Sequence, residues 1–306
     1  MISKITSKDI ESILDYKISE KLKKVINEFD LSYEDITQEQ KEDYILNVIK
    51  VLLSDIVQSG KHRINEWENG WSENLLEFKN SKNINSLIPK YHGKKRYAHW
   101  KQNIINPLTE NFDYKIHLCF VDAILEKYLS QSNIENLYEF GCGPAYHLVR
   151  INQNYPNINL FGFDWTKASQ QIIKQINEIL NININCQNFD FFNPNYSIDI
   201  KKNSAFLSVA ALEQTGENYK NFIDFIIEKK PSICINIEPI SEVLDDKNLI
   251  DFLSIKYFEK RNYLSSYLSY LQKLEDDKKI EILDVRRTYA GSYFIEGHTL
   301  VVWKVV

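Results

Sequence analysis

The chain contains little cysteine, glycine, proline or methionine. Its 306 residues include four cysteines, nine glycines, seven prolines and one methionine. Cys119, Cys142, Cys186 and Cys234 lie far apart, and no pair has the spacing of metal ligands, so we predict no metal site. Each cysteine stands among apolar neighbours. We therefore expect buried, reduced thiols, which fit a reducing cytoplasm.

Long hydrophobic runs and a strong excess of either charge are also missing. No window approaches the roughly 18 uninterrupted apolar residues that span a bilayer, and residues 1–5 lack the layout of a secretory signal. We therefore expect a cytoplasmic protein without a membrane partner. The 42 acidic and 37 basic residues give a net charge of −5, which argues against nucleic acid as a partner. A hydrophobic content of 43% excludes a disordered or fibrous chain.

The first 115 residues are predicted to form helices and irregular connections. Ser7 is expected to begin a helix that runs to about residue 28, because its apolar residues fall on one stripe. Thr37 is expected to cap a second helix that ends near residue 60, and a third is expected over 65–78. The periodicity fades over 83–113, which predicts a long loop.

Beyond residue 115 the pattern changes to an alternation of strands and helices. This alternation predicts an α/β fold, with a parallel sheet covered on both faces. After the alternating strands and helices, a long helix is expected over 247–274. Two strands then follow in succession, at 280–286 and 298–306, and imply a hairpin with one antiparallel strand. The earlier strands are expected at 137–140, 159–163, 182–186, 205–209 and 233–237.

A glycine turn, Glu139-Phe140-Gly141-Cys142-Gly143, follows the first of these strands directly and precedes a helix. Glycines let the backbone approach a ligand closely, and the helix N-terminus offers free N–H groups. A dinucleotide site would need a third glycine where this chain has Tyr146, which disfavours a nicotinamide oxidoreductase.

Two acids follow the next strands, at the sheet edge where open α/β sheets bind ligands. Asp164 stands 23 residues after Gly141, where a carboxylate can accept both hydroxyls of a ribose. Asp190 follows the third strand and is placed to accept an adenine amino group, with Phe191 or Phe189 beside the ring. An Asp at a strand end is also typical of a turn or a helix cap, which is the alternative for each acid.

The glycine turn and the segments at Asp164 and Asp190 resemble the ordered motifs of class I S-adenosylmethionine-dependent methyltransferases. So does a further segment, Ser208-Val209-Ala210-Ala211-Leu212-Glu213-Gln214. The resemblance covers about residues 115–306. It implies a Rossmann-like, mostly parallel seven-stranded sheet with one antiparallel strand, and S-adenosylmethionine as cofactor. We accordingly interpret 116–306 as the methyltransferase domain and 1–115 as a helical cap that binds substrate. The cofactor site implied comprises Glu139, Gly141, Gly143, Asp164, Trp165, Asp190, Phe191 and Ser208.

The chain departs from the family pattern at two positions. Ala145 replaces a glycine that is common in the turn, and Gln214 stands where a histidine often follows the Leu-Glu pair. The second departure leaves the assignment of a base open. Glu213 and His298 are the candidate catalytic residues, because both are expected near the cleft at strand ends.

The segment 90–101 holds five lysines and arginines, no acid, and interleaved aromatic residues. Cations beside rings can bind anionic groups while a sugar or base stacks on the rings. We interpret the segment as a lid over an anionic or sugar-like acceptor. The alternative is a solvated basic loop anchored by buried aromatics. The candidate substrate-binding residues are Tyr91, Lys94, Arg96, Trp100, Gln214 and Glu238.

The predicted activity is methyl transfer from S-adenosylmethionine to an oxygen or nitrogen of a small polar molecule. One alternative is a cofactor-binding but non-catalytic regulatory or partner subunit, which the missing histidine after Glu213 keeps open. An RNA or protein methyltransferase is a further alternative. The identity of the acceptor is left open, as is the oligomeric state, with a homo-oligomer among the options.

Overall fold

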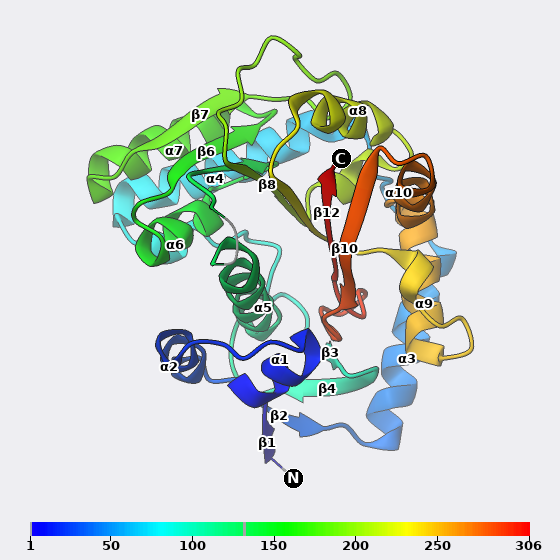
Figure 1. The fold of residues 1–306 in the computed structure, drawn as a ribbon. Helices are drawn as coiled ribbons and strands as arrows, with labels where there is room; N and C mark the ends of the chain where they lie inside the picture. The colour runs from blue at the N-terminus through cyan, green and yellow to red at the C-terminus, as the bar shows by residue number, and fades with distance from the viewer. Residues whose placement is uncertain (1, 131–132) are drawn as a thin grey trace.

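The computed structural model describes residues 2–130 and 133–306 and is built around a seven-stranded sheet (Figure 1). The strand order is β10-β12-β9-β8-β5-β6-β7. The strands run parallel except β12, which is antiparallel to both β9 and β10. This confirms the predicted fold class. The strands are β5 Asn136–Phe140, β6 Asn159–Asp164, β7 Ile184–Asn188, β8 Ser204–Val209, β9 Ile233–Glu238, β10 Ile280–Arg287 and β12 Thr299–Val305.

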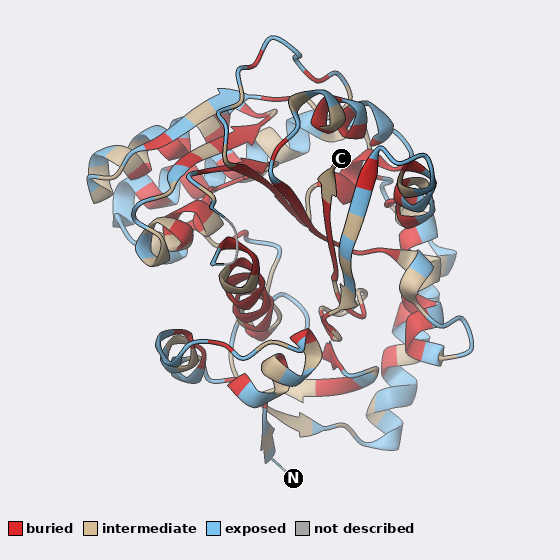
Figure 2. Ribbon diagram, viewed as in Figure 1, coloured by how far each residue is buried: buried red, intermediate tan, exposed pale blue. Residues whose placement is uncertain are grey.

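The two faces of this sheet differ in chemistry because successive side chains of a strand point to opposite sides. Aliphatic residues such as Leu137 and Leu207 pack against α5 (Phe112–Leu129), α6 (Tyr146–Asn154) and α7 (Lys167–Leu180). Aromatic residues such as Phe140 and Phe206 pack against α8 (Lys220–Lys229) and α10 (Tyr267–Asp276). The central strands β5, β8 and β9 are therefore buried along their whole length (Figure 2).

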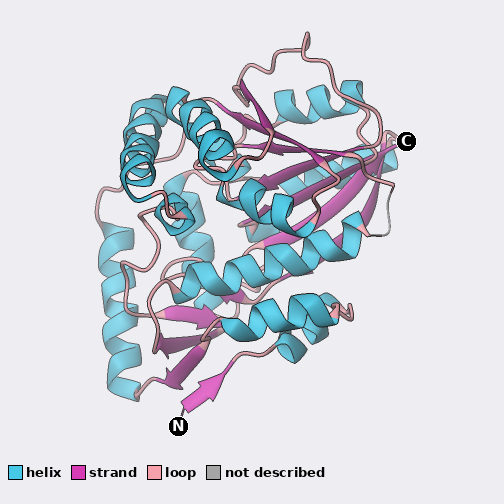
Figure 3. Ribbon diagram, turned by 90° about the vertical axis from the view of Figure 1, so that its left-hand side faces the viewer, coloured by secondary structure: helices cyan, strands magenta, loops and turns pink. Residues whose placement is uncertain are grey.

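A second, antiparallel sheet has the order β1-β2-β4-β3-β11, and it corrects the prediction that residues 1–115 contain only helices and irregular connections. Its strands are short and, apart from the hairpin of β3 and β4, pair across long sequence separations, so they leave little period-two pattern in the sequence. The two sheets lie at opposite ends of the molecule (Figures 1 and 3). The strands are β1 Ile2–Lys4, β2 Ser32–Asp35, β3 Ala98–Trp100, β4 Asn103–Pro107 and β11 Ala290–Gly291.

The helix predicted over 7–28 is wrong as a single element. It is divided into α1 (Ser7–Leu14) and α2 (Glu20–Glu28) by Asp15, whose φ is +47°. The helix predicted over 247–274 is likewise divided into α9 (Leu249–Arg261) and α10, between the left-handed residues Asn262 and Ser266. Apolar residues keep their helical spacing across both breaks because the helices on either side of each break pack on the core. The spacing alone therefore does not reveal the breaks.

The other two N-terminal helices match their predicted starts more closely. Thr37 caps α3 (Gln38–Leu53) in a reciprocal pair of hydrogen bonds with Gln40, as predicted, although the helix ends before residue 60. The third predicted helix is α4 (Ile64–Ser81). The division of the chain at residue 115 stays a prediction. Within residues 2–130 and 133–306, no helix combines the length and apolar character needed to cross a membrane.

Gly291 stands where the chain between β10 and β12 leaves the large sheet to pair with β3. A Cβ atom on Gly291 would lie 1.8 Å from the carbonyl oxygen of Ile295, which is backbone and cannot swing away. We expect Gly291→Ala to lower the free energy of unfolding in urea by about 1–3 kcal/mol, as overpacking does.

Gly70 provides the matched control, because a Cβ atom there meets no atom within 4 Å. It lies inside α4, so Gly70→Ala should raise the free energy of unfolding by about 0.5–1 kcal/mol. Equal urea midpoints for Gly291→Ala and the wild type would contradict the packing described.

Candidate functional site

The glycine turn joins β5 to α6 and adopts a tight left-handed path. Gly141, Gly143 and Ala145 have φ values of +75°, +49° and +58°. A Cβ atom on Gly141 would lie 2.4 Å from the Cβ of Ala211, and one on Gly143 would lie 2.9 Å from the ring of Trp71. Only glycine fits the first two positions, as the sequence indicated.

Asp164 ends β6 and fixes this turn to the next loop. Its Oδ2 accepts a hydrogen bond of 3.0 Å from the N–H of Gly143, and its Oδ1 accepts 2.9 and 2.7 Å bonds from the N–H and hydroxyl of Thr166. Burial raises the pKa of Asp164, and these donors oppose the effect. Three acceptor positions are thus occupied by the chain, which leaves room for about one ligand hydroxyl rather than two.

A cavity of about 630 Å³ lies at this sheet edge, a volume typical of small-molecule sites. Eleven of the sixteen predicted site residues line it. They are Glu139, Gly141, Gly143, Asp164, Trp165 and Phe191 of the predicted cofactor site, Glu213 and His298 of the catalytic pair, and Tyr91, Lys94 and Gln214 of the substrate set. Asp190, Ser208, Arg96, Trp100 and Glu238 stand outside the lining.

Glu238 ends β9 and holds the short helical turn Leu212–Thr215 that follows β8. Its carboxylate accepts hydrogen bonds from the backbone N–H groups of Ala211, Leu212 and Glu213, at 3.1, 3.1 and 3.2 Å. The Ser208 hydroxyl donates a further bond of 2.8 Å. Glu238 and Ser208 therefore hold the turn at the edge of the cavity without lining the cavity themselves. Their predicted contacts with substrate and cofactor stay predictions.

Glu213 projects from this turn into the cavity. Its Oε1 accepts a 2.9 Å hydrogen bond from the Gln214 side chain, and its Oε2 has no partner among the described residues. Burial raises the pKa of Glu213 well above the usual carboxyl range, and the nearby Glu238 carboxylate raises it further. Because Glu238 accepts four donors, it is the member of the pair that holds the negative charge, and Glu213 is the one that retains a proton.

The remaining three predicted residues make contacts elsewhere. Asp190 pairs with Lys61 at 3.1 Å and accepts a hydrogen bond from the N–H of Phe192. Arg96 donates to Asn106 at 3.2 Å on the exposed surface. Trp100 is buried in β3 of the small sheet. Their contacts with adenine or substrate stay predictions.

The structure adds cavity residues beyond the sixteen predicted site residues. Phe192 stacks on Trp165 with ring centroids 6.0 Å apart, which makes a flat surface beside the ends of β6 and β7. His117 lies 4.5 Å from His298 between ring centroids, and His147 Nδ1 lies 2.9 Å from Glu139 Oε1. These histidines come from separate segments, so no spacing pattern joins them. Burial lowers the pKa of His298 to about 3, which leaves its ring neutral at neutral pH.

Helix α4 closes the cavity from the N-terminal region. Trp71 packs against the glycine turn, and Arg63 donates a 3.2 Å hydrogen bond to Gln214. The Glu68 carboxylate accepts 2.7 and 3.0 Å bonds from the first backbone N–H groups of α7. Tyr91 and Lys94 line the same cavity, so part of the predicted lid segment lies at it.

Buried polar atoms without a hydrogen-bond partner concentrate in this cavity. Within the described ranges nine such side-chain atoms occur, and six belong to cavity residues. A buried polar group without a partner is costly, so a ligand that pairs with these atoms is expected. The six are Trp67 Nε1, Glu139 Oε2, His147 Nε2, Glu213 Oε2, Arg261 Nε and His298 Nδ1.

Comparison with solved structures places this architecture among known folds. The cyclase SpnF superposes with a TM-score of 0.51 at 13% identity, over 82% of this chain and 98% of that one. The chain has the methyltransferase fold. Other similar structures are S-adenosylmethionine-dependent methyltransferases at comparably low identity. No family model and no curated protein matches the sequence.

Two methyltransferases illustrate these similarities. Magnesium protoporphyrin IX methyltransferase from Synechocystis, with bound S-adenosylhomocysteine, gives a TM-score of 0.47 at 13% identity over 63% of this chain and 86% of that one. An O-methyltransferase family 2 protein from Planctomyces limnophilus, in complex with apigenin, gives 0.42 at 11% identity over 56% of this chain. The alignment spans half the length of that second protein.

The raised pKa of Glu213 gives folding stability a pH dependence of defined sign. The folded protein retains a proton that the unfolded chain releases, so the free energy of unfolding should fall as pH rises above the ordinary carboxyl range. The slope for one proton is at most about 1.4 kcal/mol per pH unit. Urea denaturation at about pH 5 and about pH 8 measures it.

Glu213→Gln should flatten this dependence because the amide does not titrate. Glu217→Gln is the matched control, since Glu217 is exposed four residues further along. An unchanged pH slope in Glu213→Gln would show that the Glu213 carboxyl is not held in its protonated form.

Proposed function

We propose that this protein transfers a methyl group from S-adenosylmethionine to an oxygen or nitrogen of a small polar acceptor. The observation that carries the proposal is the glycine turn of β5, which opens onto a cavity rich in unpartnered polar atoms at the carboxyl ends of parallel strands. The methyltransferase fold supports it.

The residues present fit the cofactor. Gly141 and Gly143 allow the left-handed path by which the turn reaches the cavity, and Trp165 and Phe192 offer aromatic rings beside it for a purine. Asp164 retains capacity for a ribose hydroxyl, and the free Glu139 oxygen faces the cavity beside the turn. When bound, S-adenosylmethionine supplies a methyl group that is already electrophilic on its sulfonium.

The chain's own task in the chemistry is alignment of the acceptor and removal of its proton. Glu213 fits this task because its free oxygen faces the cavity and its pKa is raised toward neutrality, where a general base is effective. Glu238 fixes the backbone that carries Glu213, and Gln214 orients its carboxyl group. His298 supplies a neutral ring nitrogen on another wall of the cavity.

The similarity to SpnF favours one second candidate, a cyclase-like enzyme of the same fold that does not transfer the methyl group. SpnF is described as a cyclase and aligns over 98% of its length. Formation of S-adenosylhomocysteine distinguishes the two, because only methyl transfer produces it. The same measurement excludes a non-catalytic partner subunit.

Cofactor binding can be measured without knowing the acceptor. Calorimetric titration should show S-adenosylhomocysteine binding to the wild type, and Trp165→Ala should weaken binding about tenfold, because stacking of a base on an aromatic ring is worth about 1–3 kcal/mol. Tyr196→Ala is the control, since Tyr196 is exposed and outside the cavity. Absence of heat with the wild type would refute the proposed cofactor.

The second measurement is S-adenosylhomocysteine formation from S-adenosylmethionine in the presence of a metabolite extract. The rate should rise with pH as Glu213 loses its proton, with a midpoint above the usual carboxyl range. Glu213→Gln should lower it about 10²–10⁴-fold without weakening cofactor binding. A variant that retains the wild-type rate and pH profile would exclude Glu213 as the base.

A further inference from the structure

Four aromatic rings form a continuous wall along one side of the cavity. Tyr293 and Phe294 lie in the segment between β11 and β12, Tyr257 lies on α9, and Tyr263 follows α9. Successive ring centroids, in the order Tyr293, Phe294, Tyr257, Tyr263, are 4.8, 4.6 and 6.1 Å apart. Phe294 and Tyr257 are stacked within 8° of parallel, whereas the first and last pairs meet edge to face, at 75° and 89°. We call these four residues the aromatic wall.

A cation lies on the rings at each end of the aromatic wall. The Lys95 ammonium is 5.4 Å from the ring centroid of Tyr293 and 5.9 Å from that of Phe294. The Arg261 guanidinium is 5.5 Å from the ring centroid of Tyr263. A ring face orients a cation but carries no net charge to neutralise it. In the part of the chain that the structure describes, neither cation forms an ion pair with a carboxylate within 4.0 Å. Arg261 Nη1 donates a hydrogen bond to the carbonyl of Val57, and Arg261 Nε has no partner there. The Lys95 charge and the Arg261 Nε are therefore available to a ligand.

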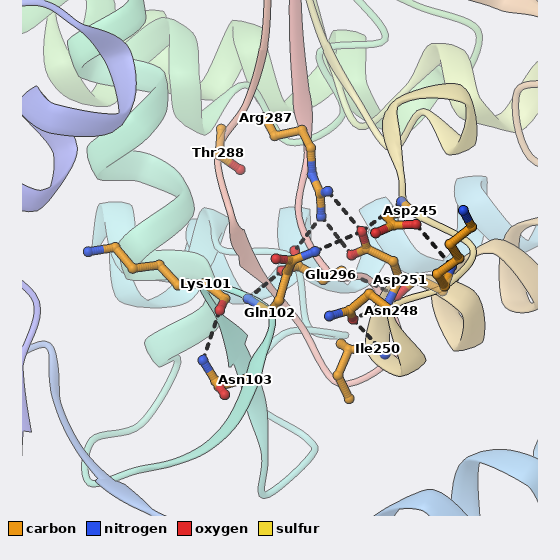
Figure 4. A network of polar contacts seen from close by, with 12 residues as sticks. Lys101, Gln102, Asn103, Asp245, Asn248, Ile250, Asp251, Arg287, Thr288 and Glu296 are labelled. Carbon is orange, nitrogen blue, oxygen red and sulfur yellow. Dashed lines mark hydrogen bonds and ion pairs between the residues drawn. The ribbon is translucent and has the colours of Figure 1, made fainter.

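A polar network ties the segment that carries Tyr293 and Phe294 to other elements. Figure 4 shows Arg287, Asp251 and Glu296 of this network. The Arg287 guanidinium donates two hydrogen bonds to Asp251 of α9, at 2.7 and 2.8 Å, and lies 3.6 Å from Glu296. The Glu296 carboxylate accepts a 2.7 Å bond from the N–H of Gln102, which lies in the turn between β3 and β4. Tyr44 of α3 donates a 2.7 Å bond to the carbonyl of Tyr293. The wall is therefore preorganised from three separate elements.

We propose that the methyl acceptor is a flat aromatic or conjugated molecule that carries an anionic group. This inference rests on the proposed function. The flat part lies on the aromatic wall, and the anionic group pairs with Lys95. The reacting oxygen or nitrogen lies at the other end, where Tyr263 and Arg261 line the cavity together with Glu213. A neutral sugar could contact the ring faces but would make no ion pair with either cation.

Calorimetric titration into the protein saturated with S-adenosylhomocysteine tests this inference with three probes. We expect 2-naphthoate to bind, and 2-naphthamide, which has the ring but not the charge, to bind at least about tenfold more weakly. Cyclohexanecarboxylate, which has the charge but not the flat ring, should also bind more weakly. Lys95→Met should reduce 2-naphthoate binding about tenfold and leave 2-naphthamide binding unchanged.

The matched control is Lys220→Met, because Lys220 also lies over a tyrosine ring, 5.5 Å from that of Tyr270, but away from the cavity. This variant should bind all probes as the wild type does. If S-adenosylhomocysteine binds and 2-naphthoate does not, or if the naphthoate and naphthamide bind equally, the acceptor class is wrong and the proposed cofactor stands. If S-adenosylhomocysteine itself does not bind, the proposed function fails as well.

Discussion

The hydrogen bond from the Gly143 N–H to the Asp164 carboxylate fixes the geometry on which the site depends. Turns at the carboxyl end of a buried parallel sheet expose backbone N–H groups that need partners, and a carboxylate can accept several at once. Two other carboxylates accept backbone N–H groups in the same way. Glu238 accepts from the turn after β8, and Glu68 accepts from the start of α7. Three carboxylates therefore hold the loops that surround the cavity, and the Glu68 contact also attaches α4 to the sheet.

This arrangement divides five acids in and around the cavity into two groups. Asp164, Glu238 and Glu68 are largely satisfied by the chain, whereas Glu139 and Glu213 each keep a free oxygen at the cavity. The satisfied acids give the loops rigidity, and the free ones provide contacts for ligands. The charged residues at the aromatic wall divide in the same way. Arg287 and Glu296 bond to other parts of the chain and hold the wall in place. Lys95 and Arg261 lie on its rings and can pair with a ligand.

Local patterns in the sequence were sufficient to predict the large sheet and the glycine turn. A strand followed by Gly141 and Gly143 is a contiguous signal, and each central strand is a short apolar run. The small sheet, the aromatic wall and the cavity histidines are assembled from distant segments, so no periodicity in the sequence predicts them. These histidines are His117, His147 and His298. The pattern located the Asp164 carboxylate at the sheet edge but not its partners, because backbone donors such as the Gly143 N–H leave no mark in the sequence.

The decisive measurement is a crystal structure with S-adenosylhomocysteine bound. We expect the purine ring beside Trp165 and Phe192 and the amino-acid portion against the glycine turn and Glu139. We also expect the sulfur to face the part of the cavity that contains Glu213. A nucleoside bound at any other place, or a cavity that stays empty at saturating ligand, would contradict the proposed site.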